Sequence, residues 1–245
     1  MSEKILAYVL QYGIYFLEVA VCALLASRGR WRQHKFLCLY VTLLFVLDGV
    51  ARPAVLNYFG QRSTQYGYFY WLTDVVLAVG IFLLTCSFFR RACKRDEKLW
   101  RIVRVMLFFV PPLVVAITAL LLTQHHKDLF ANWSHFIVEF SQNLYFSCLV
   151  LNTLLYVMIQ QLAVDDDELG LLVCGMGVQF AGEAAGLALF NLTSGDNFAR
   201  VLAPVLLPAC TLGMLLIWIY TLAKSPEAVP VQMGRQAALA EAVSD

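Results

Sequence analysis

Residues 36–57 read FLCLYVTLLFVLDGVARPAVLN, an apolar run long enough to cross a bilayer that nevertheless contains an acid and a base. Asp48 and Arg52 are four residues apart, so on a helix they lie one turn apart and can pair. Pro53 follows and leaves a backbone carbonyl free beside them. Intramembrane charges cost about 2.5–3.5 kcal/mol each on insertion scales and tend to face one another inside a bundle. The stretch predicts a buried pair, either structural or able to bind a ligand or a proton.

The composition predicts an all-α polytopic membrane protein. Hydrophobic residues make up 60% of the 245 residues and charged residues only 14%, too few to cover a soluble globule. The net charge of +1 gives no indication of nucleic-acid binding. Windows of about 20 apolar residues predict seven transmembrane helices, at 5–26, 36–57, 68–89, 102–123, 136–159, 169–191 and 200–222. They form one domain, 1–224, followed by a cytoplasmic tail, 225–245, that we expect to be flexible.

The basic residues predict the orientation of the bundle. They concentrate in the loops after the first and third windows, at Arg28, Arg30, Arg32, Lys35, Arg90, Arg91, Lys94, Arg95, Lys98 and Arg101. Cytoplasmic loops carry the excess of Lys and Arg, so the N-terminus is predicted outside and the C-terminus in the cytoplasm. The first window is read as a retained helix, because its basic flank follows it. The acidic run 165–168 falls in a cytoplasmic loop, but acids contribute little to this rule.

Nothing in the sequence indicates an enzyme, a cofactor or a metal site. The chain has no G-x-S-x-G, H-E-x-x-H or P-loop motif. The seven cysteines form no C-x-x-C pair, which favours free thiols. All four histidines, which a haem or a metal would need, lie in predicted loops: His34, His125, His126 and His135.

The first helix contains a stripe of tyrosines that leads to an acid. Tyr8, Tyr12 and Tyr15 are spaced to share a face, and Glu18 lies one turn further along. We expect this face to look inward. The alternative is an aromatic belt at the membrane interface with one buried, hydrogen-bonded or protonated Glu.

Polar residues of the other helices fall at a similar depth in the outer half of the membrane. Asp74 is the nearest partner in depth for Arg52, and a small-x-x-x-small pattern, Gly182 to Gly186, predicts close helix packing. The candidate ligand-binding set is Asp48, Arg52, Asp74, Glu139, Gln142, Asn143, Gln179, Glu183 and Arg200. Shared depth predicts a polar cavity open to the outside, whose excess of acids invites a proton, a cation or an amine. The alternative is a salt-bridge network that only fixes helix packing.

Three short segments carry a family resemblance: residues 66–74, the exit Phe88-Phe89-Arg90-Arg91, and Ile217-Trp218-Ile219-Tyr220 leading to Ser225-Pro226-Glu227. Together they resemble a group of uncharacterised seven-helix integral membrane proteins abundant in acidobacteria. The fifth helix departs from that group, which has an arginine where this chain reads Val138-Glu139-Phe140-Ser141-Gln142. The resemblance implies a bacterial inner membrane and a stand-alone seven-helix module, and it implies no reaction.

Two functions follow as expectations. The first is a non-enzymatic, receptor-like or accessory module that binds a small ligand in the polar cavity, or binds a membrane or cytoplasmic protein partner. The second is a small proton- or cation-coupled transporter that uses the intramembrane carboxylates. We find no internal repeat at the scale of half the chain, which many carriers show.

Overall fold

The computed structural model describes residues 2–29, 31, 34–60, 63–125, 133–162, 166–192 and 197–224, and these are almost entirely helical. The side chains of 2–8, 95, 122, 124–125, 133–135, 186–192 and 197–204 lie outside the description, as does the predicted tail, 225–245. The elements are α1 (Ser2–Ser27), α2 (Lys35–Leu44), the π-helix η2 (Phe45–Ala51), α3 (Arg52–Phe59), α4 (Thr64–Ala92), the 3-10 turn η3 (Cys93–Arg95), α5 (Glu97–His125), α6 (Trp133–Gln161), α7 (Asp167–Leu192) and α8 (Asn197–Lys224).

Each predicted window corresponds to a helix, with α2, η2 and α3 following one another without a break from residue 35 to residue 59. Within the described residues, six helices are long and apolar enough to cross a membrane, and α7 is not among them. The side chains of its residues 186–192 lie outside the description, and the described remainder of α7 alone does not reach the length and hydropathy of a span. The six are consistent with a multi-pass membrane protein.

The helices extend beyond the apolar windows, because a helix can continue past the hydrocarbon layer into polar surroundings. This overturns part of the expectation for the histidines. His125 is the last residue of α5, and His135 lies in the first turn of α6, rather than in a loop.

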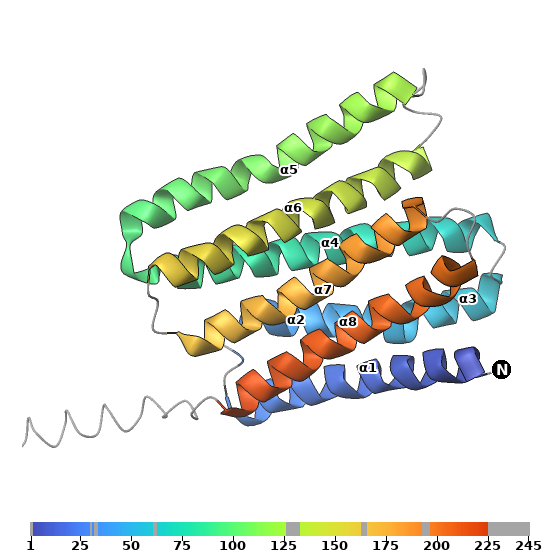
Figure 1. Ribbon diagram of the computed structural model, residues 1–245, viewed down its shortest axis with the longest axis horizontal. Helices are drawn as coiled ribbons and strands as arrows, with labels where there is room; N and C mark the ends of the chain where they lie inside the picture. The colour runs from blue at the N-terminus through green and yellow to red at the C-terminus, as the bar shows by residue number, and fades with distance from the viewer. Residues whose placement is uncertain are drawn as a thin grey trace, which may run out of the picture.

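Six of the helical segments form a closed ring, in which each packs on two neighbours. The order around the ring is α1, α8, α7, α6, α4 and α2, which returns to α1. Helices that follow one another along the chain run in opposite directions, with α2, η2 and α3 taken as one rod, and α5 packs on the outside of α6 (Figure 1). Side chains from all six ring segments therefore meet in one interior, and the loops that follow α1, α4 and α6 share one end.

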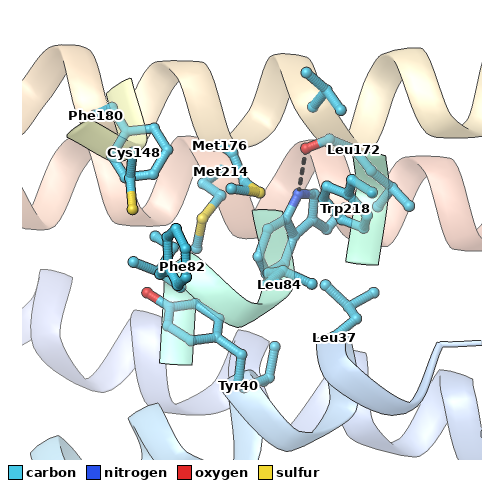
Figure 2. Packing of buried hydrophobic residues seen from close by; sticks show 14 of the residues in the cluster. Leu37, Tyr40, Phe82, Leu84, Cys148, Leu172, Met176, Phe180, Met214 and Trp218 are labelled. Atoms are coloured by element: carbon cyan, nitrogen blue, oxygen red, sulfur yellow. Dashed lines mark hydrogen bonds between the residues drawn. The ribbon is translucent and has the colours of Figure 1, made fainter. Parts of the chain in front are cut away.

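The interior of the ring is densely apolar toward the end that holds these loops. The largest fully buried side chains of the interior are Trp218, Tyr40 and Phe180, each 2% exposed or less. Figure 2 shows the Trp218 indole reaching the carbonyl of Leu172 across the α7–α8 contact, an N···O distance of 3.0 Å. The indole N–H of Trp218 therefore has its hydrogen-bond partner inside the bundle.

Glycines bring α7 and α8 together. Gly182 belongs to the predicted small-x-x-x-small pattern, whose second glycine, Gly186, lies outside the described side chains. A Cβ added at Gly182 would lie 2.5 Å from the Cβ and Sγ of Cys210. One added at Gly175, two turns earlier, would lie 2.8 Å from Nε1 of Trp218. Neither position leaves room for a methyl group, so any residue other than glycine would force the two helices further apart.

The stripe on α1 only partly follows the prediction. Tyr15 is half-buried and faces η2, whereas Tyr12 is 69% exposed and points away from the bundle. The inward face is Ile14, Glu18, Val21 and Leu25, all buried. Tyr12 lies two residues from Ile14, which places it on the far side of the helix.

Candidate functional site

Arg52 occupies the first turn of α3 and holds two carboxylates. It forms an ion pair with Asp48, one turn earlier in the same helical rod. Its Nη2 also lies 3.7 Å from Oδ1 of Asp74 on α4. The three side chains are 13%, 28% and 22% exposed, in that order, so they are largely but not completely buried. The structure thus brings together the two acids and the base that the sequence places at one depth.

The rest of the guanidinium is held by one face of α4. Nε donates to Oγ1 of Thr73 at 2.9 Å, and Nη2 reaches the carbonyl of Tyr70 at 3.4 Å. The guanidinium carbon lies 4.3 Å from the centre of the Tyr70 ring, a cation–π contact. A planar group with several donors suits such a site better than an ammonium. We call Arg52, Asp48, Asp74, Thr73 and Tyr70 the Arg52 centre.

The backbone at Asp48 is free of its usual helical partner. In an α-helix its carbonyl would accept from the N–H of Arg52, but η2 is a π-helix and that N–H donates to Leu47 instead. In the π register the next donor would be residue 53, a proline with no N–H. The hydroxyl of Tyr15, from α1, fills the gap and donates to the Asp48 carbonyl at 2.8 Å. A side chain from another helix therefore stabilises the π turn that presents Asp48.

Glu18 is completely buried at 0% exposure, on the inward face of α1. Neither of its carboxyl oxygens has a hydrogen-bond partner among the described residues. Asp48 is the one described charged group that acts on it electrostatically. Glu18 was expected to face inward but was not included in the predicted binding set. An acid within an apolar helix on the tyrosine stripe was the signal that could have added it.

A second polar pair comes from α7. Nε2 of Gln179 lies 3.4 Å from Oε1 of Glu183, while Oε1 of Gln179 and Oε2 of Glu183 are buried without a described partner. The buried phenol of Tyr40 lies within electrostatic reach of Glu183 and of Glu18. The predicted α7 residues thus face the same interior as the acid on α1.

Glu18, Asp48, Asp74 and Glu183 form a chain of electrostatic neighbours. The negative charge of Asp48 repels a negative charge on Glu18, and that of Asp74 repels negative charges on both Asp48 and Glu183. We call Glu18, Asp48, Asp74 and Glu183 the carboxyl cluster. It draws one residue each from α1, η2, α4 and α7, and Arg52 is the cation that contacts it among the described side chains.

The α6 residues of the predicted set do not join the cluster. Gln142 is exposed, and Asn143 donates to Oγ1 of Thr118 on α5 at 3.0 Å. Glu139 is half-buried and makes no hydrogen bond or ion pair with another described residue. The residues of α6 that point into the bundle are instead Ser141, Leu144 and Cys148, all buried. The predicted polar residues therefore lie on other faces of the helix. The side chain of Arg200 lies outside the described part of the chain.

The opposite end of the bundle carries an ion-pair network that the sequence analysis did not predict. Arg91, at the end of α4, binds both carboxylate oxygens of Asp166, at 2.7 and 2.9 Å. Glu168 lies 3.4 Å from Arg91 and 2.9 Å from Nε2 of His34. Oδ1 of Asp166 also accepts from the N–H of Leu169 and so caps α7. The acidic loop thus neutralises a basic one at the same end.

Comparisons of the chain with protein-family models, with functionally described proteins and with solved structures found no match. Among the described residues, no group of three or more histidine, cysteine or acidic side chains is placed to hold a metal ion. The carboxyl cluster and the Arg52 centre together are the candidate functional site.

Proposed function

We propose that the chain is a non-enzymatic integral membrane protein of the bacterial inner membrane, with seven spans, an external N-terminus and a cytoplasmic C-terminus. Six helices with the length and hydropathy of membrane spans support it, and α7 completes the same bundle. Large apolar side chains point outward from several helices, such as Phe16 at 74%, Phe108 at 75% and Phe146 at 65% exposure. Outward apolar surface of this extent suits lipid contact.

In this proposal the protein is a receptor-like or accessory module that binds a small cationic ligand at the Arg52 centre. The observation that carries it is charge: four carboxyls that are completely or largely withdrawn from solvent lie near one another, and one guanidinium contacts two of them. Buried acids need a partner, and a ligand with N–H donors and a positive charge supplies both the charge and the hydrogen bonds. A protonated amine fits this requirement.

Asp48 and Asp74 are the ligand-binding groups in this proposal, because both are partly exposed and both are held in place by Arg52. Each is between a fifth and a third exposed, and Arg52 holds both. An amine nitrogen that binds them shares them with the guanidinium, so affinity depends on the second oxygen of each carboxylate. Removal of either charge should weaken binding.

Purification in a mild detergent followed by mass spectrometry of the bound molecules tests the proposal. We expect a small cationic molecule with the native protein and its loss in Asp74→Asn. Glu139→Gln is the matched control, since it removes an acid of the same bundle outside the cluster, and should retain the molecule. A stoichiometric protein companion with no small molecule would make the chain an assembly subunit and the cluster structural.

A proton- or cation-coupled transporter is the second candidate. It is favoured by the break in the second rod, where a π-helix meets a proline beside charged groups, and by unpartnered carboxyl oxygens on both α1 and α7. Transporters bind ions at such discontinuous helices. Uptake of a labelled amine into vesicles under an imposed pH gradient separates the two candidates: a carrier accumulates it, and a receptor does not.

A further inference from the structure

We infer that Glu18 is a proton-binding site, and that it holds its proton as a neutral carboxylic acid in the ligand-free protein. The inference rests on the proposed function and its membrane arrangement. It identifies a proton as the cation bound by Glu18, a member of the carboxyl cluster that Arg52 does not contact.

The first argument is burial without compensation. The Glu18 side chain is 0% exposed, and both oxygens lack hydrogen-bond donors among the described residues. A carboxylate in such a place loses its hydration and gains nothing in return, whereas the neutral acid loses far less. Ile14, Val21 and Leu25 extend the same buried face and offer no polar atom beyond the helix backbone.

The second argument is the charge of the surroundings. On η2, the facing group is Asp48, which is negative and engaged by Arg52. On α2 it is the phenol of Tyr40, and on α1 itself the phenol of Tyr15. The neighbouring α8 contributes no charged group that acts on Glu18 within its described side chains. A negative Glu18 would face a second negative charge, so proton uptake removes both the desolvation and the repulsion.

The balance of the step is simple. One proton adds to one carboxylate oxygen of Glu18, and the O–H so formed is a donor where none existed. The proton comes from water and returns to it, so no other reactant is needed. When the proton leaves, the interior gains one negative charge next to Asp48, which a cationic ligand can then offset.

Infrared spectroscopy of the purified, ligand-free protein in lipid vesicles tests the inference. A protonated carboxyl absorbs apart from a carboxylate, and its band shifts when H₂O is replaced by D₂O. We expect such a band at neutral pH in the native protein, its loss in Glu18→Gln and its retention in Glu139→Gln. Absence of the band, or an unchanged band in folded Glu18→Gln, would overturn the inference.

Two further variants keep the test decisive. If Glu18→Gln does not fold, Glu18→Asp keeps an acid in place and should move the band, whereas an unmoved band contradicts the assignment. Glu183→Gln separates the two unpartnered acids, because the Glu18 band should survive it. The measurement needs no ligand, so failure of the amine to co-purify and failure of the proton site remain distinguishable outcomes.

Discussion

Removal of the hydroxyl of Tyr15 should destabilise the protein through a backbone atom on another helix. Tyr15→Phe keeps the ring and deletes the donor that lies 2.8 Å from the Asp48 carbonyl. A buried acceptor left without a partner costs about 1–3 kcal/mol. For a chain of this size each kcal/mol lowers Tm by about 2–4 °C. Tyr12→Phe is the control, because Tyr12 points away from the bundle and should leave Tm unchanged.

The reason for the cost can be tested by giving the carbonyl another donor. Pro53→Ala restores an N–H at the position that the π register directs toward Asp48. In that background the loss of unfolding free energy caused by Tyr15→Phe should be smaller, and what remains is the lost hydrogen bond from Nε2 of Gln11 to the Tyr15 hydroxyl, 2.7 Å long. A double-mutant cycle measures this coupling. Thermal unfolding in detergent, followed by intrinsic fluorescence, supplies the four values. An equal cost in both backgrounds, or no cost in the native one, would refute the account of the π turn.

Three other predictions concern stability and are measured in the same assay. Arg52→Met should lower the free energy of unfolding by about 3–5 kcal/mol, because it leaves two largely buried carboxylates without their cation. A negligible decrease would show that Asp48, Asp74 and Arg52 are not desolvated. Gly182→Ala should cost about 1–3 kcal/mol by overpacking against Cys210, and Cys210→Gly should recover part of it. Asp166→Ala should cost about 0.5–2 kcal/mol through loss of the α7 cap, and unchanged stability would contradict the capping role. In the Asp166→Ala protein, Arg91→Ala should lower the free energy of unfolding by less than it does in the native protein, because Arg91 has already lost Asp166 and keeps its longer contact with Glu168.

The positions of the helices could be predicted from the sequence, because each apolar window is long and bounded by polar residues. The pairing of Asp48 with Arg52 follows from local spacing, and the involvement of Asp74 follows from depth. The π turn could not be predicted in this way. Pro53 shows from the sequence that one backbone donor is missing. The π-helical register of η2 also depends on the Tyr15 hydroxyl of α1, which donates to the Asp48 carbonyl.

The rotation of each helix about its axis was the main source of error. Depth along the membrane can be read from residue number, whereas the face turned inward depends on the whole bundle. Glu139 and Gln142 lie off the inward face of α6, because Ser141 and Leu144 pack inward. The ion pair between Arg91, at the end of α4, and Asp166, before α7, joins residues far apart in the chain. No short sequence pattern predicts it.

The central claim is that the carboxyl cluster binds a cation through Asp74 and its neighbours. The most direct measurement is Tm of the purified protein during titration with a small alkylammonium chloride, set against sodium chloride at equal ionic strength. A ligand that binds the folded state stabilises it by about 2.7 kcal/mol at a hundredfold excess over Kd. We predict a rise in Tm for the native protein and for Glu139→Gln, and none for Asp74→Asn. An equal rise in all three, or no rise in any, would contradict the account.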